Sequence, residues 1–358
     1  MEEAVHKHYI DWLRNLGILF LFVFHTARIF DSLEANYVKG VPDPVSDGIV
    51  ISSYWFMPLL FLLAGMSAYF ALRKYSAKEF LKERARRLLI PFIFGLVAVV
   101  PPQAYIARIH FGTAGNYFDF LKSYFTDFSD ITGYFGSFTP GHLWFIMYLI
   151  VITVVLLPLL LKIIRKGFTP KLFLNPGLLL LPAVALVILS ALPGLGGKNI
   201  FVYAGYVLLG FLIASDERII RMIDEKRYLF FVFAAAGMAE IFIETNTIGN
   251  QSGFTTIGVL FSILHFFIFW ITLLAILGFG KHYLDRESKF MAYFSRAAFP
   301  VYILHQTYII VIGYFVLMLN VNTPLKFLLI SGFAFLACIL SYEGLRRLRP
   351  LKILFGVK

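Results

Sequence analysis

The feature that most constrains this chain is a series of apolar runs, each about 18–25 residues long. A helix of about 20 apolar residues crosses the roughly 30 Å hydrocarbon core of a bilayer. Helices of soluble proteins need a polar outer face, so they rarely show such runs repeatedly. The chain is 59% hydrophobic and 15% charged, whereas soluble chains average roughly 45–50% and about 25%. We therefore predict an all-α polytopic membrane protein.

The apolar runs predict about ten transmembrane helices. They are Asp11–Phe30, Ile49–Leu72, Leu88–Ile109, His142–Ile164, Leu178–Leu192, Ile200–Ala214, Tyr228–Glu244, Phe254–Phe279, Ala292–Leu319 and Pro324–Leu345. The fifth and sixth are short, and a miscount at this point would merge them.

The basic residues predict how these helices are oriented. Cytoplasmic loops carry an excess of lysine and arginine. If the N-terminus is inside and the sides alternate, the outer segments hold few of the 32 basic residues: Arg28, Lys39, Arg108, Lys122, Lys198 and Lys326. Both termini are therefore predicted to be cytoplasmic. This topology explains the net charge of +11 better than nucleic-acid binding does.

The chain is predicted to form one membrane-embedded domain over residues 1–358, in the plasma (inner) membrane. The longest predicted outer loop, Phe111–Gly141, contains an amphipathic stretch at about residues 117–128 that is expected to lie in the outer interface. The single cysteine, Cys338, lies in an apolar run and is predicted to be a packed side chain without a catalytic role. No small-residue cleavage site follows the first apolar run, so we expect the first helix to be a retained anchor.

Two ionisable residues of the first predicted helix lie on one face. Arg14 and His25 are eleven residues apart, which is three turns plus roughly 20°. His25 is roughly 16 Å further along the helix, near the middle of the membrane or beyond. The pair offers an anion-binding guanidinium near the cytoplasm and a general base deeper in the bilayer. The alternative is an arginine that snorkels to the surface and a histidine bonded to a neighbouring helix.

An arginine cluster lies at the cytoplasmic mouth of the third predicted helix. Arg84, Arg86 and Arg87 precede Pro91. Arginine binds phosphate groups bidentately, so the cluster could bind a phosphorylated ligand made in the cytoplasm. Alternatively, it only orients the helix.

Two later segments carry polar residues that could contact a substrate. His142 and Trp144 open the fourth predicted helix at its outer end, where they either anchor the chain in the aromatic belt or bind an acceptor. Tyr302 and His305 follow Pro300 in the ninth helix, and this proline is expected to bend the helix or free a carbonyl group.

Four ionisable side chains, His25, His265, His305 and Glu240, are predicted to lie at a similar depth in the membrane. Such groups are costly in hydrocarbon, so together they suggest a polar interior cavity. Each of them could instead form a simple interhelical hydrogen bond. The sequence contains no Gly-rich phosphate loop, GxSxG elbow, HExxH motif or metal-spaced cluster. We therefore expect no metal site and no permanently bound cofactor.

These residues resemble the signatures of the transmembrane acyltransferase type 3 family. The similar segments are Arg14-x10-His25, the arginine cluster before Pro91, Phe56–Gly65, His142-Leu-Trp144-Phe145 and Tyr302-Ile-Leu-His305-Gln306. The last two also resemble the branch that contains the glucans biosynthesis protein C succinyltransferases. The similarity runs from about Tyr9 to Leu345 and is weak over Leu178–Gly253.

The resemblance implies an O-acyltransferase, an enzyme that transfers groups other than aminoacyl groups. An acyl group such as acetyl or succinyl would move from a cytoplasmic acyl-CoA to a hydroxyl of an extracytoplasmic or membrane-linked carbohydrate. Carried over to this sequence, His25 would be the general base or an acyl relay. Arg14 would assist the donor, and the arginine cluster would bind its phosphates.

The expected partners are acyl-CoA as donor substrate, a carbohydrate or glycolipid acceptor and the lipid bilayer, but not nucleic acid. The residues expected to contribute to substrate binding are His142, Trp144, Tyr302, His305 and Glu240. Direct transfer and an acyl-histidine intermediate are both open.

A transporter of a lipid-linked sugar or an organic anion is the main alternative function. Polar residues in mid-membrane and a helix broken by proline suit that class too. The absence of an internal sequence duplication, and the stripe from His25 through Arg14 to a basic inner mouth, favour the enzyme. A non-catalytic scaffold would not explain costly histidines in mid-membrane.

Overall fold

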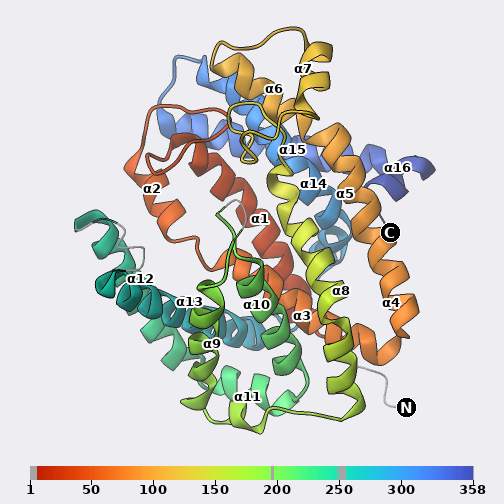
Figure 1. Ribbon diagram of the computed structural model, residues 1–358, viewed down its shortest axis with the longest axis vertical. Coiled ribbons are helices and arrows are strands. Elements are labelled where there is room, and N and C mark those ends of the chain that lie inside the picture. The colour runs from red at the N-terminus through yellow and green to blue at the C-terminus, as the bar shows by residue number, and fades with distance from the viewer. Residues whose placement is uncertain (1–5, 195–196, 248, 250–254, 358) are drawn as a thin grey trace. The chain divides into compact units, whose positions relative to one another are not determined.

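The computed structural model describes residues 6–194, 197–247, 249 and 255–357. The protein is all-helical, with 77% of its residues in helices and no strand in the described ranges. The helices, labelled in Figure 1, are α1 His8–Phe30, α2 Pro44–Ile51, α3 Phe56–Lys74, α4 Ala77–Arg84, α5 Ile90–Phe94, α6 Pro101–His110, α7 Tyr117–Tyr124, α8 Trp144–Arg165, α9 Leu181–Ser190, α10 Ile200–Ala214, α11 Glu217–Glu225, α12 Arg227–Thr247, α13 Thr256–Leu284, α14 Lys289–Leu317, α15 Thr323–Leu345 and α16 Arg349–Leu354. The all-α prediction is confirmed.

Among the described residues, eight helical segments are long and apolar enough to cross a membrane, or nine if the bent pair α10–α11 is one span. The eight correspond to predicted spans one to four and seven to ten. The sixth predicted span is α10, which meets α11 at 97°, and the fifth is a shorter apolar helix, Leu178–Ser190. The polytopic architecture is confirmed, with eight or nine candidate spans where about ten were predicted. The cytoplasmic placement of both termini stays a prediction.

The chain divides into two compact units that each draw on distant parts of the sequence. Unit 1 comprises Met1–Gly17, Ile51–Phe80 and Val151–Met291, and unit 2 comprises Ile18–Val50, Leu81–Ile150 and Ala292–Lys358. Several helices, among them α1 and α8, belong partly to each unit. The prediction of one domain over residues 1–358 remains untested by this division.

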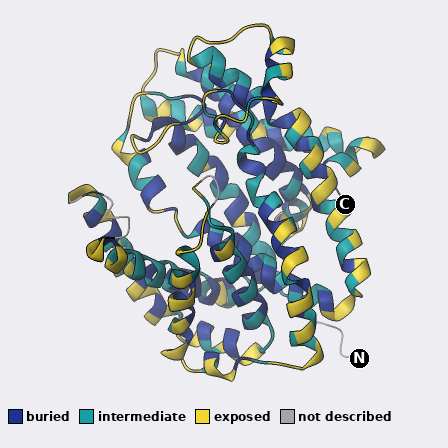
Figure 2. Ribbon diagram, in the orientation of Figure 1, coloured by how far each residue is buried: buried dark blue, intermediate teal, exposed yellow. Residues whose placement is uncertain are grey.

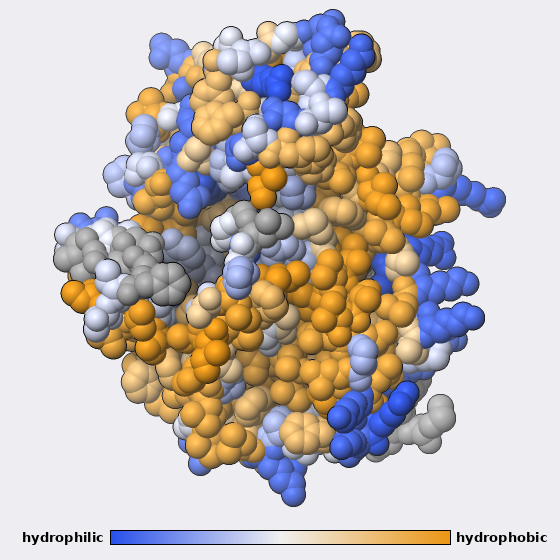
Figure 3. Space-filling view, viewed as in Figure 1, coloured by the Kyte–Doolittle hydropathy of each residue, from blue (hydrophilic) through white to orange (hydrophobic). Residues whose placement is uncertain are grey.

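The outward faces of the spans are apolar, as lipid contact requires. On α12, Leu229, Phe231, Val232 and Phe233 are exposed. Figure 2 shows exposed residues along this helix, and Figure 3 shows that the surface over α12 and α13 is largely hydrophobic. A row of large exposed apolar side chains of this kind would be unfavourable in water and marks a surface that contacts a membrane.

Within unit 1, α3 and α10 pack so closely that glycine is required where they cross. A Cβ at Gly65 would lie 1.9 Å from the carbonyl oxygen of Val207. A Cβ at Gly210 would lie 1.9 Å from the carbonyl oxygen of Leu62. Membrane helices associate largely through van der Waals packing, and small residues allow their backbones to approach. This crossing therefore holds the second predicted span against the sixth.

Prolines shape the span Ala77–His110, most of which lies in unit 2. The π-helical turns Ala85–Leu89 and Gly95–Val99 interrupt it shortly before Pro91 and Pro101. Proline cannot donate a backbone hydrogen bond and its ring clashes with the preceding turn, so the helix widens at these points. The widened turns carry two of the predicted arginines and lead to Gln103, which contributes to the site described next.

The predicted interfacial segment corresponds to α7 within unit 2. The helix ends at Tyr124, rather than near residue 128. Phe120 and Tyr124 are buried against Ala104, whereas Phe118 on the opposite side is exposed. The amphipathic pattern is therefore real, and its location at the membrane surface stays a prediction.

Candidate active site

Three histidines from three different helical elements meet within unit 2. His25 comes from α1, His142 from the short 3-10 helix Gly141–Leu143 that precedes α8, and His305 from α14. The ring centroid of His305 is 5.1 Å from that of His25 and 5.0 Å from that of His142. Each of the three was a predicted site residue, and the structure joins them in what we name the histidine cluster.

His142 is held in one orientation through both of its ring nitrogens. Its Nε2 lies 2.7 Å from the carbonyl oxygen of Ile303 and must donate to it, because a carbonyl only accepts. Its Nδ1 then accepts from the side-chain amide of Gln103 at 3.3 Å. Gln103 also donates to Thr307 Oγ1 at 2.7 Å, and Thr307 donates to the carbonyl oxygen of Val99 at 2.8 Å. The hydrogen bonds thus assign the tautomer of neutral His142, and they leave it no free nitrogen.

The double proline before Gln103 explains why this network can form. Pro102 has no N–H to donate. The N–H of Gln103 donates to the carbonyl oxygen of Val100 at 2.9 Å, rather than to that of Val99. The carbonyl group of Val99 is left for the hydroxyl of Thr307. Sequence analysis missed Gln103 and Thr307, although two prolines followed by a glutamine inside an apolar run were a visible signal.

His305 differs from His142 because one of its nitrogens is free. Its Nδ1 donates to the carbonyl oxygen of Tyr302 at 2.6 Å, so a neutral ring keeps its lone pair on Nε2. This Nε2 is buried and has no hydrogen-bond partner among the described residues. Leaving a buried acceptor unpaired costs about 1–3 kcal/mol. Exceptions of this kind are rare and call for a functional explanation, such as a catalytic role.

His25 is the most accessible member of the histidine cluster. It is half-buried, whereas His142 is 6% and His305 0% exposed. Its ring is inclined by 50° to that of His305. A ligand that enters the cluster can therefore reach His25 more readily than the other two rings, which suits the predicted general base.

A charged network follows His25 by one helical turn. Arg28 donates to Asp31 at 2.9 Å and to Glu34 at 3.0 Å, and Lys39 lies 3.3 Å from Asp31. The side chains of Arg28 and Asp31 are 7% and 0% exposed, so each depends on its partner for charge compensation. Burial, the largest influence, lowers the pKa of Lys39, and Asp31 acts in the opposite direction. In the sequence analysis, Arg28 and Lys39 were noted only as two of the few basic residues in the predicted outer segments.

Two other residues of unit 2, Tyr302 and Trp144, were predicted to bind the acceptor substrate. Tyr302 lies against the histidine cluster. Its hydroxyl donates to the carbonyl oxygen of His142, and its ring centroid is 5.7 Å from that of His305. Trp144 packs its ring against Tyr148, with centroids 5.4 Å apart. Tyr302 therefore supports the cluster directly, and the role of Trp144 stays a prediction.

The predicted donor-binding arginines are divided between the units. In unit 1, Arg14 donates to Asp11 at 2.8 Å and to Ser67 at 3.0 Å. In unit 2, Arg87 pairs with Glu83 at 2.7 Å, and Arg86 is exposed. Arg86 and Arg87 lie in the first π-helical turn and Arg84 caps it. Phosphate binding by these residues stays a prediction.

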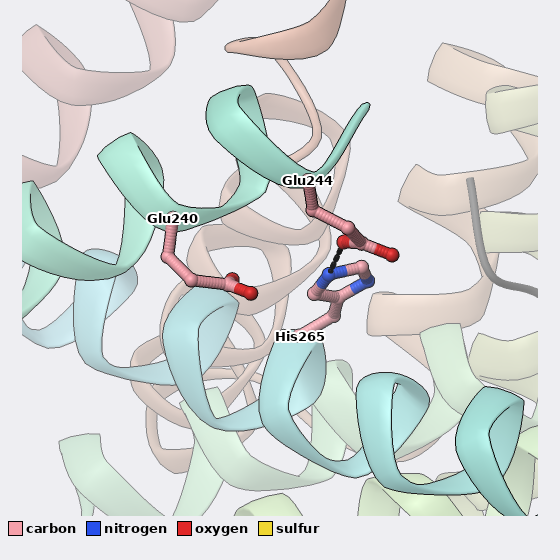
Figure 4. A group of neighbouring side chains, drawn as sticks. All are labelled: Glu240, Glu244 and His265. Atoms are coloured by element: carbon pink, nitrogen blue, oxygen red, sulfur yellow. Dashed lines mark hydrogen bonds and ion pairs between the residues drawn. The ribbon is translucent and has the colours of Figure 1, made fainter. Parts of the chain in front are cut away.

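Glu240 and His265 lie in unit 1, where they meet Glu244 (Figure 4). The sequence placed Glu240 and His265 at a depth similar to that of His25 and His305. The structure groups the first pair within unit 1 and the second pair within unit 2. Sequence analysis did not assign Glu244, which is buried and bonds to His265 at 2.7 Å.

Comparison with protein-family models gives one match that covers most of the chain. Residues 7–343 match the model described as an acyltransferase domain. The search for similar curated proteins and the search for similar solved structures gave no match. The matched residues include most of both units and the whole histidine cluster.

Proposed function

The chain belongs to the acyltransferase domain family, and from this premise we propose that it is a membrane O-acyltransferase with a cytoplasmic acyl-CoA as donor and a carbohydrate as acceptor. Its helices make it an integral multi-pass membrane protein, and its family makes it an enzyme that transfers acyl groups. The proposal adds the donor, the acceptor and the roles of individual residues. The single observation that supports it most is the histidine cluster, which holds a free basic nitrogen inside a membrane protein.

The proposed chemistry uses the three imidazoles differently. His25 takes the proton of the acceptor hydroxyl as the oxygen attacks the thioester carbonyl carbon. The carbon–sulfur bond then breaks, and the departing thiolate of coenzyme A receives the proton from His25. The free Nε2 of His305 can accept the N–H of His25 and so orient its other nitrogen toward the acceptor. His142, with both nitrogens engaged, positions the backbone of α14 around His305.

The location of the cluster suits this reaction. The His305 ring is completely buried and its neighbours include Phe22, with centroids 5.9 Å apart. A site closed to bulk water limits hydrolysis of the thioester and strengthens electrostatic interactions with the developing charge. The acyl-pantetheine arm is thin enough to reach such a site from the side on which coenzyme A is made.

The arginine cluster is the proposed site for the phosphates of the donor, and Arg14 is proposed to assist. The exposed Arg86 and the surface pair Arg87–Glu83 can exchange their present contacts for phosphate at little cost. Trp144 and Tyr302, both in unit 2, are proposed to contact the acceptor, whereas a contact from Glu240, in unit 1, stays a prediction. We also propose a relation to the glucan succinyltransferase branch. Transfer of a succinyl group would support this relation, and transfer of acetyl groups alone would contradict it.

A transfer assay tests the proposed function. Membrane vesicles that contain the protein would be supplied with radiolabelled acetyl-CoA or succinyl-CoA, and the carbohydrate fraction would be examined for label that mild alkali removes. We expect alkali-labile label from at least one donor, absent from vesicles without the protein. Failure to label with either donor, together with no binding of acyl-CoA to the purified protein, would refute the proposal and favour the transporter.

Replacing Arg86 and Arg87 by alanine is expected to weaken acyl-CoA binding. A hydrogen bond to a charged group contributes about 1.5–3 kcal/mol, so each substitution should raise the Kd about tenfold or more. Added salt should weaken binding to the wild type more than binding to the double variant. Calorimetric titration at two ionic strengths measures both effects. Arg165→Ala, at the end of α8, is the control with unchanged Kd, and an unchanged Kd in the double variant would contradict the assignment.

A further inference from the structure

A second group of ionisable side chains lies within unit 1, on the packed helices α12 and α13. Glu240 and Glu244 are one turn apart on α12, and His265 faces them from α13. One ligand atom from each residue lies within 4.8 Å of the other two. In Figure 4 the two carboxyl groups and the imidazole ring point toward one another.

Glu244 is buried, and Glu240 and His265 are partly buried, on helices where charge is costly. Both α12 and α13 are long and apolar enough to cross a membrane. Glu244 is 4% exposed, and its Oε2 lies 2.7 Å from Nε2 of His265. Glu240 is partly buried, and its Oε2 is shielded from solvent without a hydrogen-bond partner among the described residues. A buried oxygen without a partner is costly, so this position favours a bound ligand.

The geometry of the group leaves room for a bound cation. The hydrogen bond between Glu244 and His265 leaves Oε2 of Glu240 without a partner among the described residues. A cation bound between the three residues would give this oxygen a partner and would contact one ligand atom from each side chain.

We propose that Glu240, Glu244 and His265 bind a divalent transition-metal ion of the zinc class. An imidazole nitrogen beside two carboxylate oxygens suits zinc or manganese, whereas calcium and magnesium prefer oxygen ligands alone. Ligand atoms in a tetrahedral zinc site lie about 3.3 Å apart, as bonds of about 2.0–2.1 Å require. The 2.7 Å contact between Glu244 and His265 therefore needs to open by about 0.6 Å.

The site would hold the ion rigidly and leave it one open position. His265 lies between Phe261 and Phe269, with ring centroids 6.1 Å from each, which limits rotation of the imidazole. Ile241 and Ile268, beside the ligands on the two helices, belong to one buried apolar cluster that keeps α12 against α13. Three protein ligands on such a scaffold leave a fourth position for water or an oxygen of a substrate. Glu240 would then be a metal ligand rather than a direct contact to the acceptor.

Zinc binding by the full-length protein in detergent tests the proposal independently of acyl transfer. After treatment with a chelator and its removal, the protein would be titrated with Zn²⁺ by calorimetry, and bound zinc would be counted by mass spectrometry. We expect one ion per chain and a higher thermal midpoint in the presence of zinc, because ligand binding stabilises the folded state.

Isosteric variants then identify the ligands. Glu240→Gln, Glu244→Gln and His265→Gln should each lower zinc affinity at least about tenfold, since losing even an outer contact of a metal site costs about 10–100-fold. Glu240→Gln is the safest for folding, because it breaks no hydrogen bond described in the structure. His282→Gln is the matched control: His282, also on α13, pairs with Asp224 of α11 at 3.1 Å and belongs to no group of three possible metal ligands among the described residues.

Three outcomes would overturn the inference. They are no zinc bound to the wild type, zinc bound equally by Glu240→Gln and the wild type, or equal loss of zinc in His282→Gln. A higher thermal midpoint in Glu240→Gln without any zinc binding to the wild type would show that the buried carboxyl destabilises the fold and that no zinc offsets this cost. Loss of acyl transfer alone would decide nothing about the metal, and loss of zinc alone would leave the proposed transferase standing.

Discussion

Purified His25→Ala is expected to insert and fold like the wild type and to lose acyl transfer. The imidazole of His25 is the accessible member of the histidine cluster and the proposed acceptor of the hydroxyl proton. Removing a general base lowers the rate about a hundred- to ten-thousandfold. The transfer of label from radiolabelled acyl-CoA to carbohydrate measures this loss, and the thermal midpoint in detergent shows whether the fold is intact.

The matched control for this prediction is His282→Ala. His282 is an exposed histidine that pairs with Asp224 at 3.1 Å and belongs to no proposed site, so its removal should leave the rate unchanged. His25→Gln retains a polar side chain of similar size and should be as inactive as the alanine variant. If His25→Ala keeps wild-type activity, the proposed mechanism is wrong, although membership of the family is unaffected.

Gly65→Ala is expected to cause a large loss of stability for a single added methyl group. The new Cβ would lie 1.9 Å from the carbonyl oxygen of Val207, 2.8 Å from its carbon and 3.0 Å from the backbone nitrogen of Phe211. Backbone atoms cannot rotate away as a flexible side chain does, so α3 and α10 must separate. Overpacking costs about 1–3 kcal/mol or more, which lowers the thermal midpoint of a chain of this length by roughly 1–4 °C.

Two further glycines give this prediction a matched pair. Gly210→Ala places a methyl group 1.9 Å from the Leu62 carbonyl oxygen at the same crossing, so it should be similarly destabilising. The double variant should cost less than the sum, because both methyl groups separate the same helices. A Cβ at Gly332, on α15, meets nothing within 4 Å, so Gly332→Ala should be neutral or slightly stabilising. Equal thermal midpoints for Gly65→Ala and Gly332→Ala would contradict the close packing.

Much of the architecture could be predicted because the bilayer imposes a length on each element. The runs from Asp11 to Phe30 and from Pro324 to Leu345 were placed within a few residues of α1 and α15. The region Leu178–Ala214 was the least certain, and there the structure has a short helix and a bent pair. The sequence predicts this part poorly because a short apolar run does not reveal whether it crosses the membrane or ends within it.

The histidine cluster shows which features of a site can be predicted from the position of a residue along its helix. The spacing of Arg14 and His25 gave a depth and a face for each, and the depth of His305 followed from its place in the ninth span. That His142 would lie between α14 and Gln103 did not follow, since no spacing relates residues 103, 142 and 305. Glu244 was missed for the same reason: its partner, His265, is on another helix.

By itself, the sequence determined that the chain is a helical membrane protein, that its polar residues are few, and that they resemble those of one acyltransferase family. The thickness of the hydrocarbon core and the cost of polar groups in lipid constrain each segment separately. These properties can therefore be predicted from each segment of the sequence alone. The tertiary structure alone decided which polar groups meet. In unit 2 they are three imidazoles, and the buried Nε2 of His305 has no partner among the described residues. In unit 1 they are two carboxylates and a histidine. These contacts depend on packing between segments far apart in the chain, as at Gly65 and Gly210. A local sequence pattern does not identify the distant residue that it will contact.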